Sequence, residues 1–350
     1  MGTLLDFKIL ESRGVLMNSI DAQNLRRSEL GLTDLANRNT ARLLGTINQD
    51  MITNNWGAPA KRLPVRNKGG GTATVGTMTC TFPTADSSNG FVNVTFFSAH
   101  AGFRIVPRVI DQTGGLVTPP DEFAFLFGQT EREIADLLET QIHTTLDAAK
   151  ATTSASTFVG AASKYPLVGD TLQVSAAEQP LYYNFLKSIY QADDFGRTGI
   201  QVIGDAQMPS YVSQYINQGS GNSANTAFQF NNIEFSYSND IVTTAATSAV
   251  STAFAMAPGS LGILAQVSPD AKAGRTSKSK GIEWGVARSN LMGIDMEIMM
   301  SDDCADLTAI TANSLDTNGY AEFYQMGINV AIITAYDQST NGSIKKIDFL

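Results

Sequence analysis

The residues best suited to chemistry are few and scattered through the sequence. Histidine occurs as His100 and His143, and cysteine as Cys80 and Cys304. Ser98 lies close to His100, but no Gly-x-Ser-x-Gly elbow surrounds it to expose a nucleophile. Two cysteines so far apart predict neither a disulfide framework nor a zinc site. The sequence therefore does not favour hydrolytic or zinc chemistry.

Two further patterns are weak signals for a bound cation or phosphate. Asp302, Asp303 and Asp306 lie within five residues, but a calcium site needs more ligands and a defined loop, so we expect a solvated acidic turn at 302–306. The glycines at 69–71 follow Lys68 without the Gly-Lys-Ser/Thr ending of a phosphate-binding loop. We therefore expect no catalytic residue, no cofactor and no metal, and the chain is not predicted to be an enzyme.

The clearest element is a long helix over residues 121–150. Pro119 and Pro120 precede it, and acids follow in its first turn, which is a helix-start signal. Apolar residues recur at helical spacing at Ile134, Leu137, Leu138, Ile142, Leu146 and Ala149. The charged residues between them are expected to form a solvated face: Glu131, Arg132, Glu133, Asp136, Glu139 and Asp147. At 1.5 Å per residue the helix would span about 45 Å, which suits a structural spine.

Composition also indicates a building block. Charged residues make up 16% of the 350, where a soluble chain usually has nearer a quarter. Much of the surface must be small and polar or buried against partners, as in large shells and fibres. No apolar run is long enough for a membrane span, and the first residues lack a signal-peptide pattern. We expect a protein made and used in the cytoplasm.

The net charge of −9 is unevenly distributed. Residues 1–70 carry ten basic and six acidic side chains, whereas the remainder carries 14 basic and 27 acidic ones. A basic segment on an acidic body suggests contact with nucleic acid or with a neighbouring copy, and an ordinary solvated surface stays open. Residues 272–280 form a second basic segment, predicted to be a flexible loop. Candidate inter-subunit or DNA-facing residues are Arg26, Arg27, Arg38, Arg42, Lys61, Arg62, Arg66, Lys68, Lys272, Arg275, Lys278 and Lys280.

Other elements surround the long helix. Residues 19–55 are helix-prone, and Gly31 and Gly45 predict a division into two or three shorter helices. Residues 61–70 are interpreted as an extended connector. Strands at 72–82 and 91–97 are predicted to form a long ribbon, with Asn89-Gly90 as a hairpin signal at its tip. Further strands are expected at 103–110, 167–174, 199–204, 228–237, 320–336 and 344–350, and shorter helices at 179–192 and 208–218. Residues 253–267 are apolar with a turn at Pro258-Gly259, and the type of the segments 283–288 and 291–300 stays open.

This order of elements resembles the major capsid proteins of tailed bacteriophages, whose fold is named after phage HK97. The resemblance covers essentially the whole chain through its organisation and not through a short motif. It implies an α+β, HK97-like capsid fold with an N-terminal arm at 1–70 and an extended β-loop at 71–118. It also implies a peripheral domain at 119–177 and 266–350, with the spine helix at 121–150, and an α/β axial domain at 178–265.

The resemblance implies a structural protein that self-assembles into hexamers and pentamers of an icosahedral head enclosing double-stranded DNA. Expected partners are other copies of the chain, a portal, a decoration protein and DNA contacted non-specifically; no membrane is involved. Because the arm begins almost at Met1, a separate scaffold protein is expected. The expected location is the virion capsid, assembled in the host cytoplasm.

Three alternatives stay open. An encapsulin-like nanocompartment shell would share the fold. Another virion protein, such as a tail tube, is usually shorter and lacks a thirty-residue helix. A secreted β-rich hydrolase is expected to show a signal peptide and a cluster of His, Asp and Glu.

Overall fold

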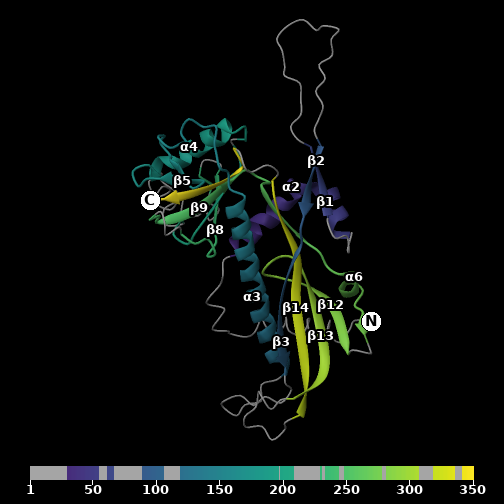
Figure 1. Ribbon diagram of the computed structural model, residues 1–350. Coiled ribbons are helices and arrows are strands. Elements are labelled where there is room, and N and C mark those ends of the chain that lie inside the picture. Colours follow the sequence, from purple (N-terminus) through teal and green to yellow (C-terminus); the bar gives the residue numbers. More distant parts are fainter. Residues whose placement is uncertain are drawn as a thin grey trace, which may run out of the picture.

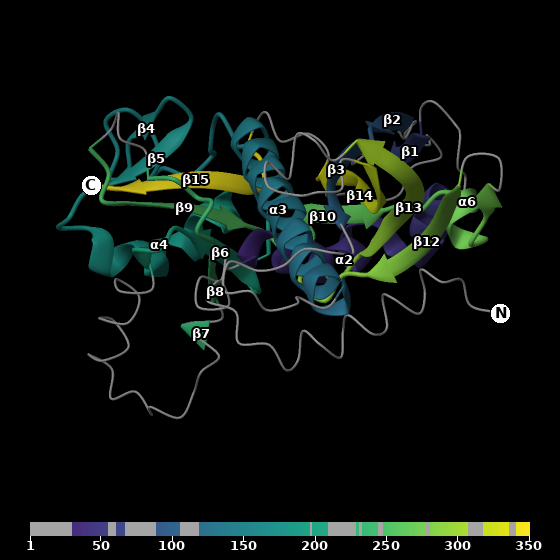
Figure 2. The ribbon, with the colours of Figure 1, turned by 90° about the horizontal axis from the view of Figure 1, so that it is seen from below.

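The computed structural model describes residues 30–54, 61–66, 89–105, 119–196, 198–208, 229–230, 233–243, 248–277, 281–306, 318–335 and 341–350. The fold is mixed α and β, with a six-stranded sheet at one end and a seven-stranded sheet at the other (Figures 1 and 2). Two long helices lie between the sheets. This confirms the α+β class expected from the sequence.

The six-stranded sheet is antiparallel throughout, in the order β10–β14–β13–β12–β11, with β3 also paired to β14. Alternate residues of its strands are buried, as Ile298 on β13 and its register partner Met326 on β14 are. One face of the sheet therefore belongs to the core. Its strands are β3 (Phe97–Ile105), β10 (Leu261–Ala265), β11 (Thr276–Ser277), β12 (Ile282–Arg288), β13 (Asp295–Asp306) and β14 (Asn318–Thr334).

The seven-stranded sheet is mixed, in the order β4–β5–β15–β9–β6–β8–β7. β15 runs parallel to β5, and β6 runs parallel to β8. All residues of β6 and β9 are buried, as expected for central strands. The strands are β4 (Leu167–Val168), β5 (Thr171–Val174), β6 (Ile200–Gly204), β7 (Gln229–Phe230), β8 (Ile233–Tyr237), β9 (Ser251–Met256) and β15 (Ile344–Phe349).

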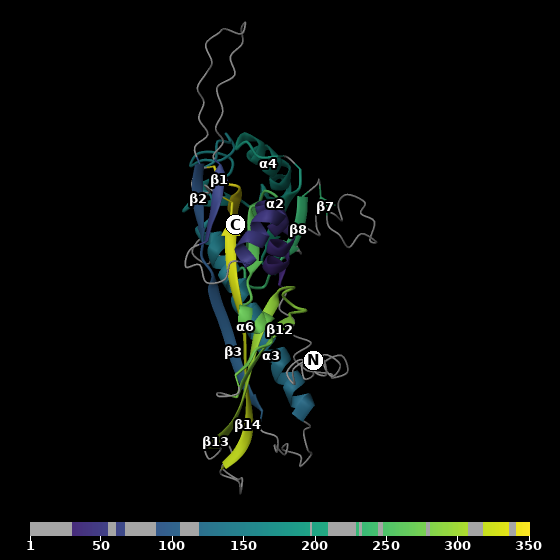
Figure 3. The ribbon, with the colours of Figure 1, turned by 90° about the vertical axis from the view of Figure 1, so that its right-hand side faces the viewer.

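Four helices are described: α2 (Gly31–Asn54), α3 (Pro119–Ala148), α4 (Gln179–Ala192) and the one-turn α6 (Pro269–Lys272). α4 packs against the seven-stranded sheet through buried residues that include Leu186 and Ile189. α3 contacts β3 and β14, so that helix and sheet form two layers in the side view (Figure 3). α2 lies on β10, where the backbone N–H of Ile263 donates to the hydroxyl oxygen of Thr40 at 2.8 Å. None of the described helices is both long and apolar enough to cross a membrane.

The main core lies beneath α3. It joins Ile134, Leu138, Ile142 and Leu146 of that helix to buried residues of α2 and of both sheets. A second core lies between α4 and the seven-stranded sheet, with Tyr165, Tyr182 and Tyr190 fully buried. The sequence places the long helix and α4 within two residues of their observed ends, because both have strong helical periodicity.

The strands of the ribbon differ from those that the sequence predicted. β1 (Lys61–Arg66) pairs antiparallel with β2 (Asn89–Val94), so residues 61–66 form a strand and not a connector. In this register Gly90 pairs with Val65 inside the ribbon, so Asn89-Gly90 is not the turn. The partner found for 91–94 is residues 61–64, and the strand expected at 72–82 lies outside the described residues.

Other expectations also need correction. α2 continues through Gly45 as one helix because it packs along β10, so tertiary contacts outweigh the cost of a glycine. Residues 302–306 belong to β13 and pair with β14; they are not a turn. Part of the basic segment, expected to be a flexible loop, forms α6 and β11. The helix expected at 208–218 falls almost entirely outside the described residues.

The final strand lies in a different sheet from the other described strands of 266–350. β15 pairs with β5 and β9 in the seven-stranded sheet, whereas β12, β13 and β14 build the other sheet. The chain therefore crosses back to the seven-stranded sheet at its end. The expected domain boundaries stay predictions.

Candidate functional site

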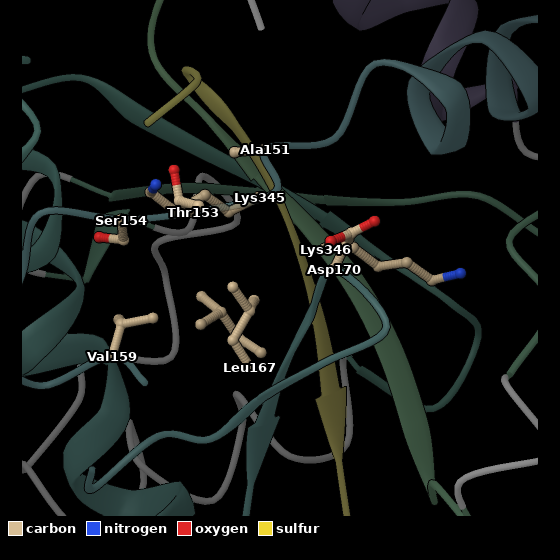
Figure 4. Close-up of a pocket in the computed structure, with 9 residues that line it drawn as sticks. Ala151, Thr153, Ser154, Val159, Leu167, Asp170, Lys345 and Lys346 are labelled. Carbon is tan, nitrogen blue, oxygen red and sulfur yellow. The ribbon is translucent and has the colours of Figure 1, made fainter. Parts of the chain in front are cut away.

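The hollows of the described surface do not resemble an active site. One, of about 10 Å³, lies beside β15 and is lined by residues that include Thr153, Ser154 and Lys345 (Figure 4). That volume is close to one water molecule and excludes a substrate. Figure 4 shows Lys345 and Lys346 directed to opposite sides of β15, so they do not form a joint cationic site.

A larger hollow, of about 330 Å³, lies on the outer face of the six-stranded sheet. Ser98, His100, Trp284 and Glu297 are among its lining residues. Ser98 and His100 are two residues apart on β3 and share this face, but no hydrogen bond joins them within the described part of the chain. The described residues also contain no group of three potential metal ligands. The geometry offers no nucleophile and base pair here.

Buried carboxylates on α3 are the feature that the sequence missed. Glu131 is 7% exposed and Glu139 is fully buried, although both were expected on a solvated face. They lie eight residues apart and so share one side of the helix. Glu131 accepts a hydrogen bond from the hydroxyl of Ser289, whose oxygen in turn accepts from the backbone N–H of Met292 at 2.9 Å. Glu131 thereby fixes the β12–β13 turn to α3.

Glu139 fixes the start of α2. Its carboxylate accepts from the backbone N–H groups of Thr33 at 3.0 Å and Leu32 at 3.3 Å, and from the hydroxyl of Ser238 at 3.2 Å. Burial raises the pKa of Glu139 to about 7, and nearby Asp240 adds to this rise, while the three hydrogen bonds oppose it. A carboxyl group is thus held at the junction of three segments, and its pKa lies near neutral pH.

The last turns of α3 meet β15 through a mixed charged and aromatic cluster. Lys346 contacts Asp147 at 2.8 Å, and Lys150 contacts the same oxygen at 3.2 Å. The His143 ring packs edge-on against Phe254, with centroids 5.6 Å apart. Burial lowers the pKa of His143, so the imidazole is neutral at neutral pH. These contacts join α3 to the seven-stranded sheet.

A buried ion pair lies farther along β15. Lys345 contacts Asp193 at 2.6 Å, and their side chains are 3% and 0% exposed. Asp193 also accepts from the hydroxyl of Ser154 at 2.8 Å and the backbone N–H of Ala155 at 2.6 Å. The carboxylate therefore ties three segments together. These contacts give the buried pair a structural role.

The described basic candidates lie in different environments and do not form one shared cluster. Arg38 pairs with Glu234 and, at 3.1 Å, with Asp34, within its own chain. Arg275 pairs with Asp270 at 2.8 Å. Arg42, Arg62 and Lys272 are exposed. The side chain of Arg66 and all of Arg26, Arg27, Lys68, Lys278 and Lys280 lie outside the described residues.

Lys61 is the one basic candidate whose position argues against a surface contact. It is 8% exposed, and its ammonium group donates to Gln266 at 2.7 Å and lies 4.8 Å from the Phe96 ring centre. Burial lowers its pKa. Lys61 therefore anchors the base of the ribbon to the body, and its inter-subunit or DNA-facing role stays a prediction.

Comparison with known proteins identifies the fold. No protein-family model and no curated protein matches the chain. Among solved structures, the capsid asymmetric unit of cyanophage A-1(L) matches with a TM-score of 0.51. The match covers 92% of this chain and 93% of that one at 12% identity.

This chain has a phage-capsid fold. Structures from Mycobacterium phages Bobi and Cain also match at 10% identity, with TM-scores of 0.48 and 0.47. They cover 95% and 96% of this chain and the same shares of their own. The resemblance to phage capsid proteins that the order of elements suggested is confirmed at the level of the fold.

Proposed function

We propose that this chain is the major capsid protein of a tailed bacteriophage and builds the icosahedral head shell around double-stranded DNA. One observation carries the proposal: the fold match with the cyanophage A-1(L) capsid extends over nine-tenths of both chains. A match over 92% of the chain extends across most of its elements and does not depend on a single common motif.

The composition and the shape of the chain support this proposal. A shell subunit buries large areas against several neighbours, which suits a chain with only 16% charged residues. The base of the β1–β2 ribbon packs on its own body through Leu63 and Val94, against Leu264 and Ile333. A two-stranded ribbon is not stable alone, so β1 and β2 would gain stability by contacting a neighbouring copy.

In this proposal the chain has the HK97-like organisation. Residues 1–70 act as the N-terminal arm, 71–118 as the extended loop, and α3 as the spine of the peripheral domain. The seven-stranded sheet and α4 form the body of the axial domain, to which β15 adds a strand. Hexamers and pentamers, a separate scaffold protein, a portal, a decoration protein and loosely held DNA are the proposed partners. The proposed location is the virion capsid, after assembly in the host cytoplasm.

The charge distribution suggests how the shell would treat DNA. The acidic remainder of the chain would repel the phosphate backbone, while the basic first 70 residues would offset that charge locally. Arg42 and Arg62 are exposed, and within the described residues neither forms a salt bridge, although the charge of Arg42 helps to lower the pKa of Glu234. They are therefore the described residues of that segment best placed for a partner.

Electron microscopy tests the function directly. The full-length protein is expressed with its neighbouring genes, purified by sedimentation and imaged in negative stain. Closed polyhedral particles of uniform size are expected. Monomers or small rings that persist at high protein concentration would contradict the proposal.

A further inference from the structure

Three segments of the chain meet at the side chain of Glu139. α2 and α3 cross between the sheets (Figure 2), and β8 contacts α2. Glu139 lies on α3, its donors Leu32 and Thr33 open α2, and Ser238 follows β8. Because the side chain is fully buried, water does not share in these contacts.

Glu139 replaces a missing local cap. The first N–H groups of a helix lack partners inside it and are normally capped by a Ser, Thr, Asp or Asn side chain just before it. α2 is preceded by Leu30, whose side chain has no acceptor. The carboxyl group from α3 takes that role, so the start of α2 depends on a residue 106 positions away.

Both protonation states of Glu139 fit these contacts, but at different cost. A neutral carboxyl group accepts from Thr33 through one oxygen, and through its hydroxyl it donates to Ser238. An ionised one accepts from all three donors, but it brings a full charge into a site closed to water. Burial accordingly raises the pKa of Glu139 to about 7, so the neutral form is the one that the folded chain favours.

The charged groups around Glu139 do not compensate that charge. Asp240, beside Ser238, raises the pKa further. Asp136 and His143 lie one turn to either side on α3, and the pKa of His143 is lowered by burial. On α2, Asp34 is paired with Arg38 at 3.1 Å. The surroundings therefore add negative charge, and the described groups include no cation within reach of the Glu139 carboxylate.

We propose that Glu139 is a proton-controlled latch between the spine helix and α2. In its neutral form it holds the first turn of α2 and the segment after β8 against α3. Once ionised, it makes opening of this junction more frequent, because opening lets water reach the charge. The latch rests on contacts within one chain and is independent of the proposed shell function.

The size of the change in the opening equilibrium follows from how far the pKa of Glu139 is raised. Each pKa unit corresponds to a factor of ten in equilibrium, so a rise from near 4.5 to about 7 allows a change of up to about 300-fold in the opening equilibrium. The change would begin near pH 4.5 and be complete a little above pH about 7. This direction is opposite to acid-induced release: here a rise in pH loosens the junction.

Hydrogen–deuterium exchange of the full-length protein tests the latch, with labelling times corrected for the intrinsic effect of pH on exchange. In the natural chain, protection of the α2 amides near Thr33 should fall between pH about 4.5 and about 7 and change little above that. Glu139→Gln, which mimics the neutral form, should keep these amides protected over that range. Glu133→Gln, an exposed glutamate on the same helix, is the matched control and should behave like the natural chain.

Infrared spectroscopy provides a second readout that does not require exchange. The carbonyl band of a buried neutral carboxyl group should disappear as the pH rises through about 7, and it should be absent from Glu139→Gln. Unchanged α2 protection across the pH range, or an equal pH dependence in Glu139→Gln, would overturn the proposal. A carboxyl band at high pH in the natural chain would also overturn it.

Discussion

The carboxylate of Glu139 accepts a hydrogen bond from the backbone N–H of Thr33 at 3.0 Å, across 106 residues of sequence. A helix cap is usually a local matter, but here the cap of α2 is on α3. The two long helices are therefore joined by a polar contact as well as by the apolar core that Leu35 and Leu138 share. The start of α2 is consequently sensitive to changes on both helices.

The overall stability should depend on pH through this residue. The pKa of Glu139 is raised in the folded chain from near 4.5 to about 7, so its stabilising contribution is complete below pH about 4.5 and is lost as the pH rises through about 7. The loss is on the order of 3 kcal/mol at higher pH. Glu139→Gln should match the natural chain near pH 4.5 and exceed it at pH about 8, as measured by urea unfolding. Equal stability curves at both pH values would contradict this assignment.

Gly31 should not tolerate a side chain. A Cβ atom at this position would lie 2.0 Å from the backbone carbonyl oxygen of Tyr237, where the first turn of α2 meets the end of β8. We expect Gly31→Ala to lower the free energy of unfolding by a few kcal/mol, because backbone atoms must move. Gly196→Ala is the control, since no atom lies within 4 Å of its Cβ position. Thermal unfolding distinguishes the two, and an unchanged midpoint for Gly31→Ala would show that α2 starts elsewhere.

The buried pair of Lys345 and Asp193 should show strong coupling. Lys345→Met alone leaves the Asp193 charge buried without its partner, and a loss of about 3–5 kcal/mol is expected. The double variant Lys345→Met with Asp193→Leu should recover much of this loss. Asp270→Ala, which breaks the exposed pair with Arg275, should cost less than about 1 kcal/mol. Additive losses in the double variant would indicate that the two side chains act separately.

Two neighbouring leucines on α3 should differ sharply in how much their replacement lowers the free energy of unfolding. Leu138 is fully buried in the main core, whereas Leu137 is 45% exposed. Leu138→Ala should cost about 2–5 kcal/mol through lost contacts and a cavity. Leu137→Ala should stay within about 0.5 kcal/mol in the isolated chain. Denaturant unfolding measures both, and comparable losses would mean that the helix is rotated from the orientation described.

Local periodicity allowed much of this fold to be predicted. α3 and α4 are amphipathic over several turns, and the strand with Ile200, Val202 and Ile203 is apolar throughout. Charged residues on α3 were predicted less well. Glu131 and Glu139 were assigned to a water-facing side because they are charged, although each precedes a buried isoleucine of the apolar face by three residues. Distant segments supply the hydrogen bonds that accompany their burial. No property of residues 121–150 alone indicates that Thr33 or Ser289 lies opposite.

The pairing of strands could also not be predicted from the sequence pattern. Residues 61–66 contain Pro64 and several charges, which favour a connector, yet they pair with β2. Lys61 was expected at the surface because lysine is rarely buried. Its burial depends on Gln266 and Phe96, one of which is far away in sequence. Partner choice of this kind depends on long-range packing, which local residue types do not encode.

Cryo-electron microscopy of particles formed by the full-length protein is the most direct test of the central claim. The account predicts a closed icosahedral shell in which this chain forms both hexamers and pentamers, and in which each β1–β2 ribbon contacts a neighbouring copy. Density for α3 about 45 Å long should identify each subunit. A reconstruction that shows an open tube, a small ring or a monomer, under conditions in which the chain is folded, would contradict it.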